Sequence, residues 1–277
     1  MPRSILVGLD GSLYSTAAVE VGIRWAGRTN ALLVGLGIID EPTICKPVAV
    51  PLGAMAHKVR RDHQLLDDAT RKVEQYLEQF ALRCAEAGVS CKLLEDVGLP
   101  GEQIMREAQR YDVILLGRES HFHFETQTTA DETLASVAKH SPRPVVAVPD
   151  DPAEGTSVVV AYDGGLQAAR ALQAFQGIGW DGSQQVHVVC VHDDRLEAAR
   201  CADRAVEFLA SHAIKAYPHP IATATPPAEV ILDQAEMFGA GLVVMGAYGR
   251  SSLKEFFFGS VTRALLQESP APLFLYH

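Results

Sequence analysis

The hydrophobic residues of this chain fall into short apolar runs separated by longer amphipathic stretches. Most of the runs are apolar throughout, which is typical of parallel strands covered on both faces. The stretches between them have helical periodicity, with apolar positions such as Val73, Leu77 and Phe80 gathered mainly on one side. This alternation predicts βαβ units and open, doubly wound parallel sheets. The runs are ILVGL, ALLVGLGII, CKLLED, VILLG and VVAV, followed by VVVAY, VHVVCVH, KAYPHPIA, LVVMG and LFLY.

The pattern occurs twice along the chain. SILVGLDGSLYSTAAV aligns without a gap with SVVVAYDGGLQAARAL, so that Asp10 stands opposite Asp163. YDVILLGRES and AGLVVMGAYG match in the same order, and each half closes with a P-x-P segment and an apolar strand. Three matched blocks indicate a duplication. We predict one domain over residues 1–150 and another over 155–277, joined by the acidic linker PDDPAEGT at 149–156.

One segment breaks this symmetry. Residues 41–63 have no counterpart of equal length in the second half. The segment could form a lid or a partner surface, but a longer surface loop is the favoured interpretation, because long insertions in loops cost little free energy.

Composition narrows the function. The 277 residues are 48% hydrophobic and 21% charged, which is ordinary for a globular protein. The net charge of −10 argues against broad binding to nucleic acid or to an anionic membrane. We expect no signal peptide and no membrane span. The five cysteines form no CxxC pair, so we expect a cytoplasmic, reducing location.

The stretch LVVMGAYGRSSLKEFFFGSVTRALLQ has the residue types of a phosphate cradle. Gly246 and Gly249 allow positive φ angles and a close approach by a ligand. The pair Gly259–Ser260 offers unpaired amides and a hydroxyl at a helix start, where anions bind readily. Arg250 adds positive charge to the loop, as does the lysine at position 254. The alternative is a strand–helix connection that needs glycine for its geometry alone.

The spacing G-x2-G-x9-G-[ST] resembles the nucleotide-binding signature of the universal stress protein family. VVVAYDGG, VHVVCVH and the final P-x-P strand also follow that family's layout, and the resemblance covers essentially the whole chain, once per half. It implies two tandem Rossmann-like, adenine-nucleotide-binding domains that pair through the strands VVAVP and LFLYH as a pseudo-dimer. It also implies a non-catalytic, ATP-binding regulatory protein that acts in stress survival through protein partners, with possible homodimers besides.

The resemblance assigns roles in the second half, where ATP, with Mg²⁺, is expected. Asp163 would contact the adenosine part and Val191 would lie beside the adenine. The glycine loop would hold the ribose and phosphates. The implied site comprises Ala161, Tyr162, Asp163, Val191, Met245, Gly246, Gly249, Arg250, Gly259, Ser260 and Val261.

The second half also departs from the family pattern. Gly165 and Ala168 stand where the first half has serines. Three phenylalanines at 256–258 crowd the loop, and we interpret them as core or subunit-contact residues rather than as partners for the base.

The first half is predicted to be a degenerate copy. Its loop GRESHFHFETQTTADETLASVA keeps Gly117, but Ser120 replaces the second glycine. Asp131 and Glu132 stand near the place of the Gly–Ser pair, and their charge would repel a triphosphate. Asp10 remains, either as a ligand contact or as a cap of the following helix.

Other chemistry has weaker support in the sequence. The run GIGWDG at 177–182 follows a helix and precedes a strand, the reverse of a dinucleotide-binding context. His121 and His123 could bind a metal with His140 or Glu125, although two histidines in a loop are common. Slow ATP hydrolysis or nucleotidyl transfer is an alternative function, for which the glycine loop offers only Glu255 as an acid. A nucleotide-free interaction module is a third.

Overall fold

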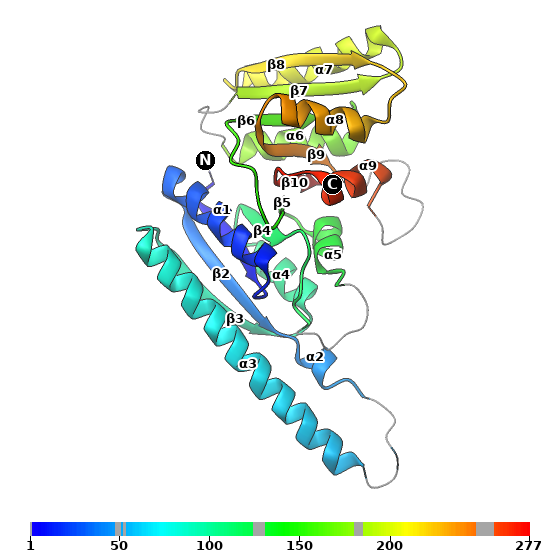
Figure 1. Cartoon of the computed structure of the whole chain (residues 1–277). Coiled ribbons are helices and arrows are strands. Elements are labelled where there is room, and N and C mark those ends of the chain that lie inside the picture. Colours follow the sequence, from blue (N-terminus) through cyan, green and yellow to red (C-terminus); the bar gives the residue numbers. More distant parts are fainter. Residues whose placement is uncertain (1, 48–50, 52–53, 124–130, 180–184, 248–257) are drawn as a thin grey trace.

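The computed structural model describes residues 2–47, 51, 54–123, 131–179, 185–247 and 258–277, and each half forms an α/β domain (Figure 1). The first half contains β1 (Ser4–Leu9), α1 (Leu13–Thr29), β2 (Leu32–Ile39), α2 (Glu41–Ile44), α3 (Met55–Glu86), β3 (Cys91–Val97), α4 (Pro100–Ala108), β4 (Val113–Gly117), α5 (Thr133–His140) and β5 (Val145–Val148). The second half contains β6 (Ser157–Ala161), α6 (Leu166–Gly177), β7 (Gln185–His192), α7 (Arg195–Ser211), β8 (Ala216–Ala222), α8 (Pro227–Met237), β9 (Ala240–Gly246), α9 (Ser260–Glu268) and β10 (Leu273–Tyr276).

The strands of the described chain join into a 10-stranded sheet with the order β3-β2-β1-β4-β5-β10-β9-β6-β7-β8. Neighbouring strands within each half are parallel, whereas β5 and β10 pair antiparallel, with Leu273 opposite Ala147 and Leu275 opposite Val145. The predicted fold class, two open parallel sheets joined through their final strands, is therefore confirmed.

The apolar strands place the core on both faces of the sheet. Ile5 and Val7 of β1 belong to one buried cluster and Leu6 belongs to another, as the period-2 alternation of a strand requires. Both clusters contain residues from each half, and Phe274 of β10 packs edge-to-face on Phe175 of α6 with ring centroids 6.2 Å apart. The hydrophobic core consequently runs through the junction of the two domains.

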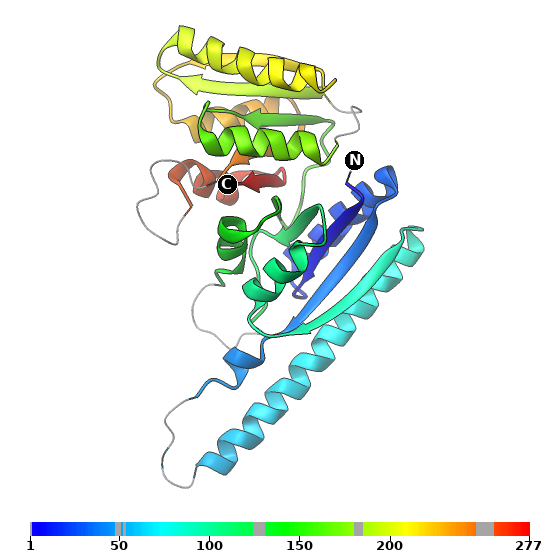
Figure 2. The same ribbon diagram turned by 180° about the vertical axis from the view of Figure 1, so that it is seen from behind.

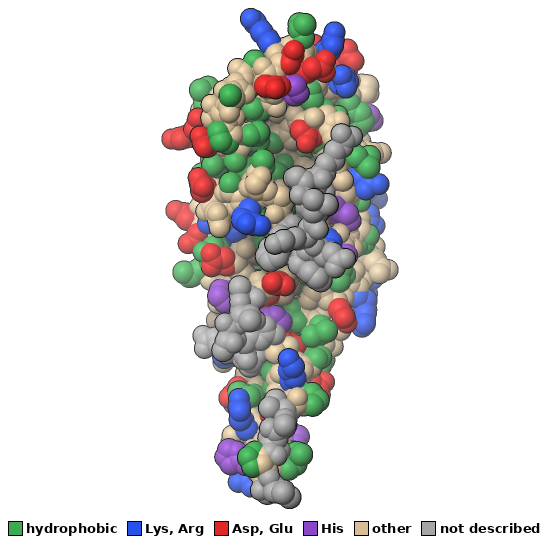
Figure 3. All heavy atoms as spheres, turned by 90° about the vertical axis from the view of Figure 1, so that its right-hand side faces the viewer, with side chains coloured by type: hydrophobic (Ala, Val, Ile, Leu, Met, Phe, Trp, Pro, Cys, Tyr) green, Lys and Arg blue, Asp and Glu red, His purple; other side chains and the backbone are tan. Residues whose placement is uncertain are grey.

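The symmetry-breaking segment is not a plain surface loop. Residues 55–63 form the start of α3, which projects beyond the sheet (Figure 1). The sequence MAHKVRRDH contains neither Gly nor Pro, and the ion pair between Lys58 and Asp62 has i, i+4 spacing. Helix propensity thus extends α3 past its packed part, which begins near the buried Ala69. Figure 3 shows basic and histidine side chains around this lower part of the molecule.

The other features of the chain agree with the described structure. GIGWDG begins where α6 ends, and Gly179 has a left-handed φ of 71° there, so the run starts as a helix-end turn; residues 180–182 lie outside the described residues. Among the described helices, none is both long and apolar enough to cross a membrane.

Candidate functional site

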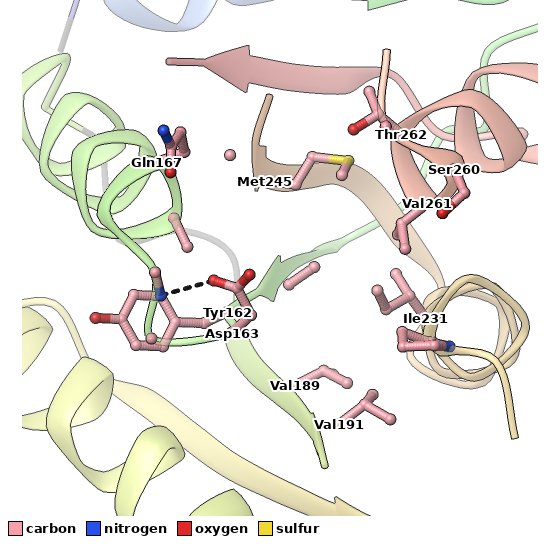
Figure 4. A pocket seen from close by; sticks show the side chains of 17 residues that line it. Tyr162, Asp163, Gln167, Val189, Val191, Ile231, Met245, Ser260, Val261 and Thr262 are labelled. Atoms are coloured by element: carbon pink, nitrogen blue, oxygen red, sulfur yellow. Dashed lines mark hydrogen bonds between the residues drawn. The ribbon is translucent and has the colours of Figure 1, made fainter. Parts of the chain in front are cut away.

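The strand order of the second half reverses between β6 and β9, and a pocket of about 440 Å³ opens there (Figure 4). It lies at the carboxyl ends of β6, β7 and β9, against α8 and the start of α9. Open α/β sheets bind ligands at such switch points. The predicted site residues within the described chain all line this pocket: Ala161, Tyr162, Asp163, Val191, Met245, Gly246, Gly259, Ser260 and Val261. Gly249 and Arg250 lie outside the described residues.

An apolar wall forms one part of the pocket. Val189 and Val191 of β7 and Ile231 of α8 lie along one part of the pocket, and Met245 of β9 lines it on the far side of β6 (Figure 4). Sequence reasoning missed Val189, although it shares the face of Val191 by strand periodicity. It also missed Ile231, for which the sequence has no signal, because the crossover of the fold alone brings α8 to this pocket. The wall suits one face of a flat, apolar ring system.

The backbone of Val191 presents a hydrogen-bonding edge to the pocket. Tyr162 N–H donates to Val189 C=O at 3.0 Å, and β6 has already ended at Ala161. On the other side of β7, His192 C=O accepts from Thr223 N–H. Because bonding sides alternate along a strand, Val191 faces the pocket, and the described chain supplies no backbone partner for it. An adjacent donor and acceptor match the Watson–Crick edge of adenine.

The start of α9 offers unpaired amides at another part of the pocket. Gly259 is the N-cap, and no side chain caps the helix. The first helical bond runs from Arg263 N–H to Gly259 C=O, so the amides of Ser260 and Val261 have no acceptor within the helix. With the helix dipole, such amides attract an anion.

The two glycines of this loop within the described chain have different reasons to be glycine. A Cβ on Gly246 would lie 2.5 Å from the backbone N of Ala168, so close packing against α6 alone requires glycine there. Among the described residues, a Cβ on Gly259 would meet nothing within 4 Å, and its φ of −57° suits any residue. Close packing in the fold therefore explains why position 246 is glycine, but it does not explain the glycine at position 259.

Asp163 has unused acceptor capacity at the pocket. Its Oδ1 accepts a hydrogen bond of 2.8 Å from Gly165 N–H, across a turn in which Gly164 has a left-handed φ of 73°. Its second carboxylate oxygen has no protein partner in the described chain, and the residue is exposed. This oxygen can accept from a hydroxyl group of a ligand.

In the equivalent aspartate of the first half, both carboxylate oxygens accept hydrogen bonds from the protein. Asp10 is 5% exposed; its Oδ1 accepts from Ser12 N–H at 2.9 Å and its Oδ2 accepts from His121 N–H at 2.6 Å. The side-chain cap of α1 is Ser12, which accepts from Ser15 N–H, so the interpretation of Asp10 as the helix cap is wrong. Asp10 instead anchors the loop that follows β4.

That loop places Phe122 where the first half would have its pocket. Phe122 is 2% exposed and belongs to a buried cluster with Leu36 and Ile38, which match Val189 and Val191 in strand register. The same cluster contains Ile104 of α4 and Leu116 of β4, the counterparts of Ile231 and Met245. The first half thus fills with its own side chain a space that stays open in the second half.

Position 8 permits this filling. A Cβ on Gly8 would lie 2.5 Å from Cδ2 of Leu116 and 2.9 Å from Cζ of Phe122, whereas its counterpart Ala161 carries such a Cβ at the wall of the open pocket. The absence of one carbon atom therefore makes room for the aromatic ring.

A histidine between two carboxylates holds the segment in place. His123 Nδ1 lies 2.5 Å from Oδ2 of the buried Asp40, and its Nε2 lies 3.5 Å from Oδ1 of Asp131. Asp131 also accepts from Phe122 N–H at 2.9 Å. The hydrogen bond to Asp40 raises the pKa of His123, with a further contribution from the charge of Asp131.

His187, His219 and Phe258 have structural surroundings. Among the described residues no three His, Cys, Asp or Glu side chains are grouped to hold a metal, and Glu125 lies outside them. His187 and His219 lie 2.9 Å apart through ring nitrogens, and His187 stacks on Phe238. Phe258 packs against the core, as predicted for it, whereas positions 256 and 257 lie outside the described residues.

The fold and the site together define a tandem of two doubly wound α/β domains with an open pocket at the switch point of the second. The family model described as "Universal stress protein family" matches residues 1–149 and 156–277. The chain belongs to the universal stress protein family.

Relatives and solved structures agree with this assignment. The chain is 25% identical to the universal stress protein Rv1996 of Mycobacterium tuberculosis over an alignment of 304 residues. This alignment covers 97% of the chain and 93% of the relative. It is 23% identical over 180 residues to the universal stress protein Slr1230 of Synechocystis, covering 60% of this chain and 58% of the relative, so the match spans less than two thirds of that protein. The crystal structure of a universal stress protein from Archaeoglobus fulgidus has the same fold, with a TM-score of 0.73, 21% identity and coverage of 99% and 98%.

Proposed function

We propose that the second domain binds one adenine nucleotide, ATP in the first place, and that the protein is a non-catalytic regulator in stress survival that acts through protein partners. One observation carries the proposal: equivalent positions are filled by Phe122 in the first domain and enclose an open pocket in the second. The volume of about 440 Å³ lies within the range of small-molecule sites.

Each part of the nucleotide has a matching feature in the pocket. The base would lie against the wall of Val189, Val191 and Ile231, with its edge on the backbone of Val191. The ribose hydroxyls would donate to the unpaired oxygen of Asp163. The phosphates would lie at the amides of Ser260 and its helical neighbours. Asp163 is the one carboxylate among the described lining residues, so Mg²⁺ would be held largely by the phosphates.

Native mass spectrometry of the freshly purified protein, with chromatography of an acid extract, tests the stoichiometry. We expect one adenine nucleotide per chain. Two nucleotides per chain would refute the claim that the first site is filled by Phe122. No bound nucleotide after addition of millimolar ATP and Mg²⁺ would refute the proposal.

Titration calorimetry of Gly259→Val tests the position of the phosphates. A Cβ at this N-cap has no described atom within 4 Å, and a branched side chain there would lie in front of the amides, so we expect ATP binding at least about ten-fold weaker. Gly27→Val is the matched control, because a Cβ there also meets nothing within 4 Å and α1 lies outside the pocket. Equal affinity in both variants would contradict the placement.

Measurement of ATP turnover distinguishes a catalytic function from nucleotide binding without catalysis. Hydrolysis of ATP that disappears in Glu255→Gln while binding persists would assign slow ATP hydrolysis to the glycine loop. We expect no such turnover in the wild-type protein beyond the rate in buffer.

A further inference from the structure

The segment that breaks the symmetry between the two halves includes an exposed helix start. Residues 55–63, the first turns of α3, project beyond the sheet in both ribbon views (Figure 1 and Figure 2). Ala69 is the first buried residue of α3, and Met55 stands 14 residues before it, which is about 21 Å along the helix axis. The start of α3 thus lies well away from the packed part of the first domain.

One side of these turns is covered by α2. Lys58, Asp62 and Leu65 recur at spacings of four and three residues, so they share one face of α3. Ile44 of α2 and Leu65 line one small cavity between the two helices. Burial raises the pKa of the Cys45 thiol at the end of α2, and the nearby charge of Asp62 raises it further. The ion pair between Lys58 and Asp62 is therefore partly buried, and the other sides of the turns face solvent.

The exposed side of this region is basic. Arg60 and Arg61 are exposed, as is Lys46, which follows Cys45, and no hydrogen bond or ion pair of these three side chains is found in the described chain. We call residues 55–63 and the adjoining Lys46 the α3 tip. Residues 41–63 carry four basic side chains and two carboxylates, so their net charge is +2 with neutral histidines. The whole chain has −10, which leaves −12 for the remainder.

The projection separates the α3 tip from the acidic remainder of the chain. The next charges along α3 cancel, because Asp67 and Asp68 are followed by Arg71 and Lys72. The distance of about 21 Å along the helix is more than twice the Debye length, which is about 8 Å at physiological ionic strength. A flat anionic surface in contact with the tip is therefore largely screened from the charge of the two domains.

Two exposed apolar side chains lie among the charges of the tip. Met55 is 60% exposed and Val59 is 47% exposed, and their spacing of four residues puts them on one side of the helix. Figure 3 shows hydrophobic, basic and histidine side chains together at this end of the molecule. Such a mixture suits the headgroup region of a bilayer, where apolar side chains enter the acyl boundary and arginines contact phosphates. A nucleic acid offers phosphates but no apolar layer.

We propose that the α3 tip binds the surface of an anionic lipid membrane, with Met55 and Val59 among the headgroups and Lys46, Arg60 and Arg61 on the lipid phosphates. The net charge of −10 argues against binding through the surface as a whole, whereas a projecting basic tip meets a planar surface without the acidic domains. This inference does not depend on nucleotide binding.

Flotation of the full-length protein with lipid vesicles tests the proposal. Vesicles of phosphatidylcholine with about 30% phosphatidylglycerol supply the anionic surface, and vesicles of phosphatidylcholine alone are the neutral control. We expect at least about ten-fold stronger binding to the anionic vesicles, and its loss in about 0.5 M salt, where the Debye length is about 4 Å. Absence of binding to the anionic vesicles, or equal binding to both kinds, would overturn the proposal.

A charge variant locates the binding surface. Each basic side chain near an anionic surface strengthens binding about five-fold, so Arg60→Gln with Arg61→Gln should weaken vesicle binding roughly 20-fold. Glutamine is a good helix former, and circular dichroism would verify the fold. The matched control is Arg195→Gln with Arg200→Gln on α7, at the opposite end of the molecule in Figure 1. It has the same net charge and should bind as the wild type does; equal losses in both variants would refute the placement.

An apolar variant separates a membrane from other anionic partners. Met55→Gln with Val59→Gln keeps every charge, and we expect at least about five-fold weaker binding to anionic vesicles. Binding to vesicles that is unchanged in this variant would refute insertion of the two side chains. If the wild type binds a DNA or RNA duplex but not vesicles, and the apolar variant binds that duplex equally well, the tip is a nucleic-acid contact and the proposal is wrong.

Discussion

At the residue scale, the two sites differ in the residue that lies at the end of the first strand of each domain, Gly8 in one and Ala161 in the other. Gly8 lets the ring of Phe122 approach the sheet, whereas Ala161 carries a Cβ at the wall of an open pocket. The same switch point therefore has a side chain in one domain and free volume in the other. Both outcomes satisfy the packing of an α/β sheet, because a cavity must be filled by protein, ligand or water.

Phe122→Ala tests whether the ring supports the first domain. Removal of a fully buried phenylalanine leaves a cavity, so we expect the free energy of unfolding to fall by about 3–5 kcal/mol. Urea unfolding followed by circular dichroism measures this loss. Phe208→Ala, at a partly buried surface position on α7, is the control and should cost much less. A change below about 1 kcal/mol for Phe122→Ala would show that the ring is not packed as described.

His123 gives the first domain a pH-dependent contribution to stability. Its pKa is raised in the folded state by the hydrogen bond to Asp40, so its contribution is fully present below the unfolded value of about 6.5 and is lost as the pH rises through the folded pKa. We expect His123→Asn to lower the free energy of unfolding more at pH 6 than at pH 9. Urea titrations at both pH values measure it, and a larger loss at pH 9 would contradict the geometry.

At the scale of elements, two helix starts lack the contacts that usually stabilise a helix end. They are the start of α3 and the start of α9. Residues 55–63 contain no fully buried side chain, and the helix has no side-chain cap at Ala54. Helix propensity continues the element there, without core contacts. At α9 no side chain caps the first amides of the helix.

Two proline variants distinguish the projecting and packed parts of α3. Arg61→Pro should disrupt only the projecting turns, with a change in the free energy of unfolding below about 1 kcal/mol, because those turns bury little. Glu78→Pro lies on an exposed face between the buried Leu77 and Phe80 and should cost about 3 kcal/mol or more. Urea unfolding measures both. Equal losses would mean that residues 55–63 belong to the cooperative core.

At the scale of the whole molecule, the antiparallel pairing of β5 and β10 joins the strands of the two domains into one sheet. Both buried clusters cross this junction, and Phe274 lies fully buried beside it. Because both domains contribute buried hydrophobic residues to these clusters, we expect unfolding of one domain to destabilise the other.

A single cooperative transition is the expected consequence. In a Trp180→Phe variant the remaining tryptophan, Trp25 of α1, reports on the first domain, while circular dichroism at 222 nm reports on both. We expect the two signals to have the same urea midpoint, and saturating ATP to raise both midpoints together by linkage. Separate midpoints would show that the domains unfold independently.

The sequence by itself determined the fold class and the location of the candidate site. Apolar runs and helical periodicity are local patterns, and the repeat of Asp10 at Asp163 and of Gly117 at Gly246 revealed the duplication before any contact was known. The described positions predicted around the second switch point come together in one pocket, because the carboxyl ends of parallel strands meet at one edge of a sheet.

Only the tertiary structure decided what occupies each space. The sequence showed that the first loop had changed, but not that Phe122 fills the space whose equivalent in the second domain is an open pocket, because that depends on the volume between segments far apart in the chain. Ile231 reaches the pocket through a crossover helix, and the linker contacts both domains through Ala153 and Glu154. Local patterns specify elements, whereas the filling of a cavity depends on the shapes that meet when those elements pack.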